Sequence, residues 1–319
     1  MEYAIWSREG LAYMSDASKP RLAFLHEATY SPEQRIHMIV LIEDILEASG
    51  VEVVHLASTD QYIQADLLFV HVDRSIVSSE TCSFALHYPN AVNAYATDIR
   101  KARYIDGLLG RNDAHDGPVI VKTDLNYAGQ PERNSQNRVR TIPRRLIARA
   151  MRLLGATDYT IRTKSDYRIY DSLAEVPRHY FGDDYVVQKF MPERDGAKNV
   201  LREYIFLGDL HYENIERSSD LIITEDEHVS CKPFVPHPRL LAFRRQLGLQ
   251  YGKIDYTMVD GEPFIFDANK TLGLGEYGDT TWLAPDVHGM LVGFAGELIR
   301  LIESSRTEPE AYAQSLLVG

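Results

Sequence analysis

Three side chains with metal-binding oxygens stand close together in the segment GKIDYTMVDGEPFIFDANKTLG, residues 252–273. Asp255 lies in its first half, and Asp267 and Asn269 lie in its second half. Carboxylate and amide oxygens are the hard ligands that Mg²⁺ prefers, and Mg²⁺ adds phosphate oxygens from a nucleotide to such a set. We therefore predict that these three side chains bind Mg²⁺ beside a nucleotide. The alternative is that they are polar residues on the wet face of a hairpin.

The same segment predicts the backbone that brings these oxygens together. Asp260-Gly261 stands between two runs rich in β-branched and aromatic residues, which is typical of a β-hairpin. Side chains alternate along a strand, so Asp267 and Asn269 point to one face. A two-residue turn places Asp255 opposite the region of 266–267, and if a bulge is allowed for, all three oxygens can share that face. Burying an aspartate in this apolar segment costs free energy unless a metal or another partner compensates.

A lysine at the end of a strand is the second candidate. Residues 118–122 (PVIVK) predict a strand that delivers Lys122 to a polar loop containing Gly129. A lysine ammonium can meet a phosphate as a point charge, and backbone N–H groups of such a loop can fold over phosphates. The order of residues does not match a Walker A loop. The alternative is a solvated lysine at a strand end.

The segment VVQKFMPE, residues 186–193, is the third candidate. A strand predicted over 185–190 ends at Met191-Pro192, which favours a flat hinge between two lobes. Hinge backbone groups can bind the edge of an adenine. The alternative is a simple strand end.

The N-terminal hundred residues must hold these candidates in place. This region has three short apolar runs and one segment with apolar residues at helical spacing. They predict a parallel α/β sheet with strands 21–26, 51–56 and 65–72 and helix 32–49. His26, His55 and His71 stand at the strand ends. No metal-ligand spacing links these three in the sequence, so we interpret them as core or rim histidines.

The remaining elements follow from apolar periodicity and turn residues. They are helix 98–109 capped by Asp98, a linker over 110–117, helix 141–154, strands 167–170, 201–207 and 210–216, and helices 238–247 and 286–303. The sequence contains no internal repeat and no low-complexity tract.

Taken in this order, these segments resemble the ATP-grasp superfamily over roughly residues 90–300. The hairpin segment is similar to that of D-alanine–D-alanine ligases and their relatives, in which two acids and an asparagine hold Mg²⁺. The resemblance implies an α/β (α+β) ATP-grasp fold with three lobes. These are an N-terminal α/β lobe over 1–115, a small lid with its hinge over 116–192, and a C-terminal lobe with the metal-binding hairpin over 193–319. It also implies that ATP lies between the last two lobes.

The resemblance assigns the cofactor-binding residues. Lys101 and Lys122 match lysines that contact phosphates, and Glu193 matches a carboxylate that holds the ribose. Lys253 falls where the ligases carry an arginine that supports the transferring phosphoryl group, so the charge is kept and the planar fork is lost. The residues that match the adenine hinge are Gln188, Lys189, Phe190 and Met191.

The substrate residues are less defined. Arg202 stands on a strand that faces the site in relatives, and a guanidinium can clamp a carboxylate through two hydrogen bonds. The loop over 271–280 meets the acceptor in relatives, so Glu276 and Tyr277 could orient an amine there, and Arg217 is a further candidate. For each of these regions, the alternative is a surface salt bridge or an ordinary loop residue.

Composition narrows the class of protein. The chain has 319 residues, 45% of them hydrophobic, and a formal net charge of -12. An acidic excess disfavours non-specific binding to nucleic acid or to an anionic membrane. The two cysteines cannot form a disulfide framework, and neither a signal peptide nor a long apolar span is evident. We expect a cytoplasmic protein.

The function implied by the resemblance is an ATP- and Mg²⁺-dependent carboxylate–amine (or thiol) ligase. It would form an acyl phosphate on an amino acid, a small peptide or a small carboxylic acid, and an amine or thiol would then displace phosphate. Three alternatives stay open: an enzyme that modifies a ribosomally made peptide, a kinase, and an ATP-binding module without turnover. A homodimer is a further expectation from the resemblance.

Overall fold

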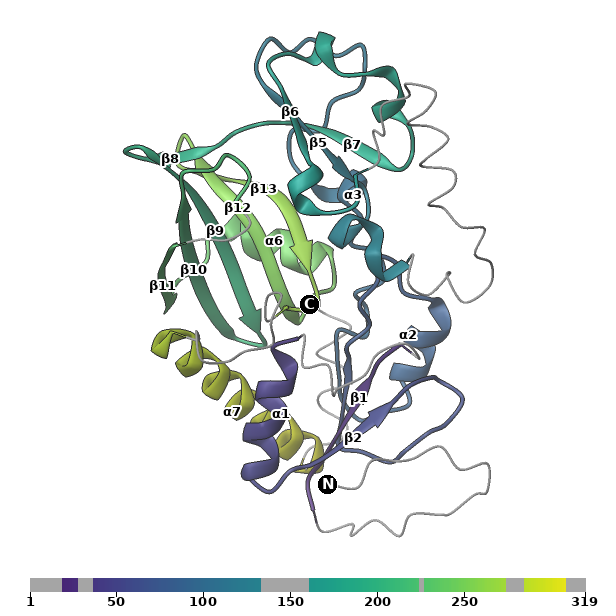
Figure 1. The fold of residues 1–319 in the computed structure, drawn as a ribbon. Helices are drawn as coiled ribbons and strands as arrows, with labels where there is room; N and C mark the ends of the chain where they lie inside the picture. Colours follow the sequence, from purple (N-terminus) through teal and green to yellow (C-terminus); the bar gives the residue numbers. More distant parts are fainter. Residues whose placement is uncertain (1–18, 28–36, 133–160, 224–226, 274–283, 308–319) are drawn as a thin grey trace, which may run out of the picture.

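The computed structural model describes residues 19–27, 37–132, 161–223, 227–273 and 284–307. Within these residues the strands form three sheets, which we name the parallel sheet, the small sheet and the large sheet. In Figure 1 the small sheet lies at the top, the large sheet lies at the left and the parallel sheet lies at the lower right. Helices accompany the sheets, so the predicted α/β class is confirmed.

The parallel sheet has the strand order β2-β1-β3-β4. Its strands are β1 (Arg21–Leu25), β2 (Glu52–Leu56), β3 (Leu67–Val70) and β4 (Ala91–Val92). β1 is buried along its whole length because apolar clusters cover both of its faces. α1 (Ile39–Ala48) joins β1 to β2, and α2 (Ser79–Ala85) joins β3 to β4. The three strands predicted here are confirmed to within two residues at each end.

The small sheet is antiparallel, with the order β6-β5-β7. Its strands are β5 (Val119–Thr123), β6 (Arg168–Tyr170) and β7 (Tyr185–Lys189). Four short helical turns belong to this region, namely η2 (Asn126–Gly129), η3 (Lys164–Asp166), η4 (Leu173–Glu175) and η5 (Arg178–Phe181). The apolar residues of β5 and β7 pack with Ile161 and Tyr180 in a cluster of their own.

The large sheet is antiparallel, with the order β11-β10-β9-β12-β13, and β8 pairs with β9. Its strands are β8 (Glu193–Asp195), β9 (Lys198–Leu207), β10 (Leu210–Ser218), β11 (Glu227–Pro233), β12 (Tyr251–Val259) and β13 (Glu262–Asn269). α6 (Pro238–Gln246) covers the face that carries Tyr204 and Ile254. α7 (Pro285–Thr307) covers the face that carries Ile205 and Leu207, as side-chain alternation along β9 requires.

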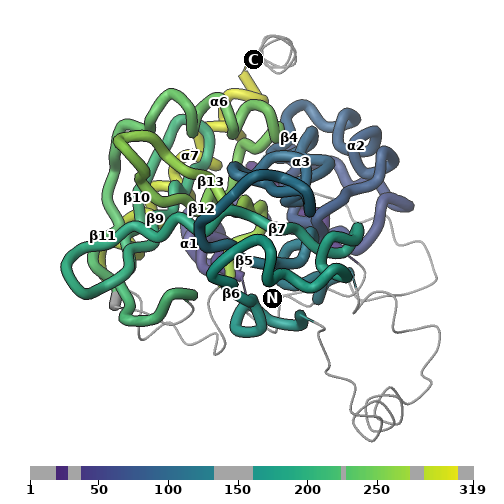
Figure 2. The backbone as a smooth tube through the Cα atoms, turned by 90° about the horizontal axis from the view of Figure 1, so that it is seen from above, coloured from purple at the N-terminus to yellow at the C-terminus, as the bar shows by residue number. Residues whose placement is uncertain are grey.

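The parallel sheet and the large sheet share one hydrophobic core. Phe24 and Phe69 of the parallel sheet join Tyr251 and Phe294 of the C-terminal region in a single cluster, and the Phe69 and Tyr251 ring centroids are 5.0 Å apart. α1 and α7 lie side by side over this core (Figure 1). In the view from above, the small sheet is seen between the two larger sheets (Figure 2). Its apolar cluster is separate from theirs.

One predicted helix is wrong. In place of helix 98–109 the structure has the single turn α3 (Lys101–Tyr104). Asp98 does not cap it, because its carboxylate accepts hydrogen bonds from Arg100 and Arg103. The predicted hairpin and the helices near 238–247 and 286–303 are confirmed, while α2, β4, β8 and β11 were not predicted. The predicted helix 141–154 lies outside the described residues.

Across the described segments of the chain, no helix combines the length and the apolar character that crossing a membrane requires.

Candidate functional site

β12 and β13 form the predicted hairpin, and their register is the one that the sequence indicated. Asp255 lies directly opposite Asp267, and Lys253 lies opposite Asn269. A register shift after Asp255 leaves Phe266 as the extra residue of a β-bulge. Because of this bulge, Phe266 and Asp267 both line one pocket although they are consecutive. Asp255, Asp267 and Asn269 are buried, with exposed fractions of 2%, 6% and 5%.

A third carboxylate, that of Glu203, lies in line with Asp255 and Asp267 and was not predicted from the sequence. β9 pairs with β12 so that Glu203 lies opposite Asp255, and the row Glu203–Asp255–Asp267 crosses three neighbouring strands. Asn214 on β10 donates a hydrogen bond to Glu203, with an Nδ2–Oε2 distance of 2.8 Å. The sequence does not show which strand will pair beside β12. An acid inside the otherwise apolar end of β9 is the signal that could have found Glu203.

Two of the predicted lysines neutralise this row. Lys101 Nζ lies 3.0 Å from Asp267 Oδ1. Lys253 Nζ forms an ion pair with Glu203 and lies 3.3 Å from Asp255 Oδ1. Ammonium groups therefore alternate with carboxylates in this buried place, which reduces the free-energy cost of burying either charge.

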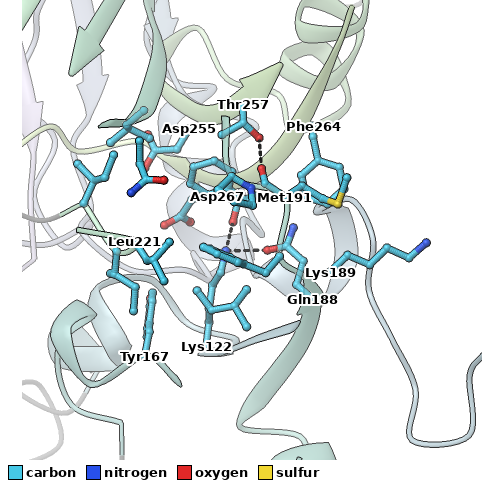
Figure 3. A pocket seen from close by; sticks show the side chains of 18 of the residues that line it. Lys122, Tyr167, Gln188, Lys189, Met191, Leu221, Asp255, Thr257, Phe264 and Asp267 are labelled. Carbon is cyan, nitrogen blue, oxygen red and sulfur yellow. Dashed lines mark hydrogen bonds between the residues drawn. The ribbon is translucent and has the colours of Figure 1, made fainter. Parts of the chain in front are cut away.

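Lys122 reaches the site from the small sheet. Its Nζ donates hydrogen bonds to Gln188 Oε1 at 2.7 Å and to the Phe266 carbonyl oxygen at 3.2 Å (Figure 3). Burial lowers the pKa of Lys122 to about 7, although the nearby Asp267 acts in the opposite direction. An anion that enters the pocket would raise this pKa and would keep the ammonium charged.

A further cation, Lys164 in η3, lines the same pocket and was not predicted. Burial and Lys253 act to lower the pKa of Lys164, but Asp255 and Asp267 raise it above its ordinary value. Lys164 therefore stays charged beside the two aspartates. The polar run Thr163–Asp166 gave no signal in the sequence because its position relative to the hairpin depends on the tertiary fold.

The two facing aspartates have different protonation tendencies. Burial acts to raise the pKa of Asp267, but the lysines around it, Lys101 above all, hold this pKa below its ordinary value. Burial raises the pKa of Asp255 above its ordinary value, and Lys253 offsets the rise only in part. Within the described part of the chain, Asp255 Oδ1 accepts no hydrogen bond. A buried carboxylate oxygen of this kind, facing a second carboxylate, is a suitable ligand for a hard divalent cation.

The pocket lies between the small sheet and the large sheet. The space between its lining atoms is about 780 Å³ when the open solvent at its mouth is included. Its charged lining residues are Lys122, Lys164, Lys189, Asp255 and Asp267. Its other lining residues are largely apolar and include Ile120, Tyr167, Phe190, Met191, Val200, Leu201, Leu221, Ile222, Phe264 and Phe266.

The predicted hinge residues 188–191 all line this pocket. The Met191 carbonyl oxygen accepts a hydrogen bond from Thr257 at 2.9 Å, which ties the hinge to β12. Gln188 is 1% exposed, and its Nε2 donates hydrogen bonds to the backbone carbonyl oxygens of Asp106 and Ile265. Because its Oε1 also holds Lys122, the Gln188 side chain fastens the small sheet to the hairpin.

The structure does not bring Arg202 and Glu193 to the carboxylate row. Arg202 neighbours Glu203 on β9 and therefore points to the opposite face of the sheet, where it forms ion pairs with Glu193 and Glu213. Glu193 Oε2 also accepts a hydrogen bond from the backbone N–H of Met258. Neither residue lines the pocket. Side-chain alternation and these ion pairs thus leave Arg202 without the position that a carboxylate clamp needs.

The other substrate candidates are not joined to the site either. Arg217 is paired with Asp195, with an Nη2–Oδ2 distance of 2.5 Å, and both side chains are exposed. Glu276 and Tyr277 lie outside the described residues.

No protein-family model matches this sequence, and no curated protein matches it significantly. The fold is similar to that of ATP-grasp ligases. D-alanine–D-alanine ligase from Bacillus anthracis complexed with ATP has a TM-score of 0.46 and 12% identity, over 91% of this chain and 99% of that chain. The macrocyclase MdnC bound with the precursor peptide MdnA from Microcystis aeruginosa has a TM-score of 0.44 and 14% identity, over 88% and 99%. The ATP-grasp ligase PsnB, complexed with a minimal precursor, Mg and ADP, has a TM-score of 0.47 and 11% identity, over 88% and 97%.

These likenesses concern the fold alone. The ligands and peptides in those structures belong to those proteins. The chemistry of this chain has to be argued from its own residues.

Proposed function

We propose that this chain is an ADP-forming ligase that uses ATP and Mg²⁺ to activate a carboxylate. The carboxylate becomes an acyl phosphate, and an amine or a thiol then displaces phosphate. The observation that carries the proposal is the buried pair Asp255 and Asp267, which face each other beside Lys101, Lys122 and Lys253. Facing carboxylates suit a divalent cation, and the surrounding ammonium groups suit the phosphates of a nucleotide.

Asp255, Asp267 and Asn269 are the residues that would hold Mg²⁺. Bound there, Mg²⁺ would supply charge neutralisation and orientation to the phosphates. The donor set fits this ion, because it consists of carboxylate and amide oxygens and because Asp255 Oδ1 accepts no hydrogen bond from the described residues. Glu203 keeps Lys253 beside Asp255 and so acts as a positioning residue.

The lysines would offset the phosphate charge. Lys122 and Lys164 line the pocket, while Lys101 and Lys253 form ion pairs with Asp267 and Asp255. Phosphoryl transfer depends mainly on positioning and electrostatic stabilisation, so several fixed cations around a metal site are the expected machinery. In the proposed site Lys253 supports the transferring phosphoryl group.

The apolar part of the pocket would hold the nucleotide base. Lys189, Phe190, Met191 and Phe264 line one side of it, and Leu221 lies across from them (Figure 3). We include the three-lobe division at 1–115, 116–192 and 193–319 in the proposal. The separate apolar cluster of the small sheet supports it, because a lobe with its own core can move as a lid over the pocket. A closed lid would exclude water, which otherwise hydrolyses an acyl phosphate.

The experiment that tests this function measures ADP release from ATP and Mg²⁺ across a panel of amino acids, dipeptides and small carboxylic acids, with amines and thiols as acceptors. We expect ADP release that depends on a carboxylate and a product lighter by one water than its two reactants together, read by mass spectrometry. A phosphorylated product without condensation would identify a kinase. Tight ATP binding with no ADP from any mixture, including candidate precursor peptides, would contradict the ligase.

A further inference from the structure

A cluster of imidazoles lies at the carboxyl ends of the parallel strands, away from the proposed nucleotide pocket. We name His26, Glu43 and His55 the histidine site, with His71 beside it. The ring nitrogens of His26 and His55 and the carboxylate of Glu43 offer ligand atoms that all lie within 4.8 Å of one another. None of these residues lines the nucleotide pocket.

The parallel register creates this cluster. β1 pairs with β2 so that Phe24 lies beside His55, and the backbone pairing continues one step further, where the His26 N–H donates to the Leu56 carbonyl oxygen at 2.8 Å. On the other side the His71 N–H donates to the Leu25 carbonyl oxygen at 2.9 Å. Three histidines that are distant in sequence therefore meet at one edge, and α1 adds Glu43 above them.

The distances suit a transition metal. His26 Nε2 lies 3.0 Å from His55 Nδ1, and Glu43 Oε2 lies 3.8 Å from His55 Nε2. In a tetrahedral site, two ligand atoms that each lie about 2.0–2.1 Å from Zn²⁺ are roughly 3.3 Å apart. The 3.0 Å and 3.8 Å distances lie on either side of this separation. His55 presents a different nitrogen to each neighbour, and the metal would take one of them. Its ring is partly exposed, with a side-chain exposed fraction of 27%, which leaves a path for the ion.

A second ring supports the geometry of the first. His26 Nδ1 lies 3.3 Å from His71 Nδ1, and the His26 and His71 rings meet edge to face with centroids 5.2 Å apart. Histidines that bind metals through one nitrogen usually make a hydrogen bond through the other, and this bond fixes the ring. His71 is 1% exposed, so it would hold His26 in place from within the core.

We propose that the histidine site binds a divalent transition metal of the Zn²⁺ class through His26, His55 and Glu43. Imidazole nitrogens suit Zn²⁺, Ni²⁺ and Cu²⁺, whereas Mg²⁺ prefers an all-oxygen set such as that on the hairpin. The alternative is a chain of hydrogen-bonded neutral histidines that binds nothing.

The position of the site indicates what the metal does. His26 and His55 lie at the sheet edge and Glu43 lies on α1, so a shared ion fastens α1 to the parallel sheet. The start of α1 is in turn bound to the segment after β13, since the Met38 N–H donates to the Leu272 carbonyl oxygen at 2.8 Å. The metal thus stabilises the contact between α1 and the segment that directly follows Asn269.

The test uses the full chain, stripped with a chelator and dialysed, and titrated with Zn²⁺ by calorimetry in excess Mg²⁺. Excess Mg²⁺ competes for the hairpin carboxylates, and the titration is repeated in an Asp267→Asn background. We expect one equivalent of Zn²⁺, and at least a tenfold weaker affinity in His55→Gln and in Glu43→Gln. The matched controls are His179→Gln and Glu175→Gln, which change exposed residues in the same way and should bind like the parent.

Co²⁺ provides an independent readout, because a low-coordinate nitrogen and oxygen site gives an intense visible absorption. This absorption should appear in the parent chain and disappear in His26→Ala and His55→Gln. If His26→Ala does not fold, His55→Gln and Glu43→Gln decide the question. Absence of Zn²⁺ binding, or equal binding by the parent and the two site variants, would overturn the proposal. Neither result depends on ATP turnover, so a failure here leaves the proposed ligase untouched.

Discussion

Two buried clusters of titratable groups belong to two differently built sheets, one across the middle of β9 and β12 and the other at the carboxyl ends of the parallel strands. On the large sheet, the carboxylates Glu203, Asp255 and Asp267 alternate with lysines, and their charges compensate one another. On the parallel sheet, the histidine site has a single carboxylate, and its imidazoles lose their charge instead. Burial lowers the pKa of His26 well below its ordinary value and that of His55 to about 4.

The protein therefore accommodates buried titratable side chains in two ways. A cluster with opposite charges stays ionised and is suited to hard ions and phosphates, which are themselves charged. A cluster without enough countercharge becomes neutral and is suited to a metal that prefers imidazole nitrogen. Five predictions test this contrast.

The largest effect is expected on the large sheet. Asp267→Asn removes one of the two facing carboxylates while it preserves shape, so we expect Mg²⁺-dependent turnover to fall by roughly a thousandfold, a loss of several kcal/mol of charge stabilisation. The matched control is Asp260→Asn, the same change at the exposed turn of the same hairpin. Turnover is measured as ADP release, and far-ultraviolet circular dichroism checks the fold. Turnover near the parent level would show that the metal assignment is wrong.

Lys122 should couple nucleotide binding to proton uptake. Its pKa is about 7 without a ligand, and phosphates should raise this pKa. At pH 8 the free protein therefore holds Lys122 largely neutral, and binding of Mg-ADP takes up nearly one proton. Nucleotide affinity should fall as pH rises above 7, by at most about tenfold per pH unit, and should be flat below it.

Calorimetry at pH 8 in two buffers of different ionisation enthalpy measures this uptake. Lys122→Met should abolish it and weaken nucleotide binding by roughly a hundredfold. Lys232→Met, at an exposed position on β11, serves as the control. The same uptake in Lys122→Met and in the parent would mean that another group carries the proton.

Glu203→Gln tests the residue that the sequence analysis missed. Lys253 loses its carboxylate partner and should move toward Asp255, which weakens the proposed metal site. We expect Mg²⁺ affinity to fall by roughly 10–100-fold, as for other groups that orient metal ligands. Titration of turnover with Mg²⁺ measures the change, with Glu175→Gln, at an exposed position that does not line the pocket, as the control. An unchanged Mg²⁺ dependence would remove Glu203 from the site.

The two clusters should lose stability in different pH windows. In the metal-free protein, His55 has a folded pKa of about 4 against an ordinary value of 6.5, so its contribution is complete above pH 6.5 and declines as pH falls toward 4. The carboxylates Glu203 and Asp267 have folded pKa values below their ordinary values, so their contributions decline only below about pH 4.5.

Thermal melts between pH 6 and 5 lie below the pKa of Lys122 and above those of the two carboxylates, so they report on the histidines. We expect the free energy of unfolding to fall by up to about 1.4 kcal/mol per pH unit for each histidine that stays neutral. His55→Gln should reduce this slope, and His179→Gln should not. A slope that is the same in all three proteins would contradict the assignment.

The smallest effect on turnover is expected at Arg202. Its guanidinium is held by Glu193 and Glu213 on the opposite face of the large sheet. Arg202→Gln should change turnover by less than about threefold, while the free energy of unfolding falls by about 1–3 kcal/mol through lost charged hydrogen bonds. Chemical denaturation and ADP release measure the two quantities. A large loss of turnover with unchanged stability would restore Arg202 as a substrate clamp.

The part of the site that lies close together in sequence was predictable. One Asp-Gly turn and side-chain alternation, both of which are local, predicted the hairpin and placed Asp255 opposite the region of 266–267, while the structure decided the bulge that pairs Asp255 with Asp267. The pocket position of residues 188–191 follows from a strand that ends at a proline. The predicted helix 98–109 failed because its second half bonds to distant strands: the Asp106 N–H donates to the Ile265 carbonyl oxygen and the Leu109 N–H donates to the Val187 carbonyl oxygen.

By itself the sequence determined the α/β class, the hairpin that carries Asp255 and Asp267, and the delivery of Lys122 by a strand. Apolar periodicity and turn residues act over a few neighbouring residues, so they can be recognised in the sequence. Only the tertiary structure decided that Glu203 lies beside Asp255 and that Arg202 points to the other face.

The tertiary structure alone also decided that His26, His55 and His71 meet. The physical reason is the same for each of these contacts. The packing of whole sheet faces against a shared core determines which strands pair. A local sequence pattern does not indicate which distant strand will lie beside a given strand.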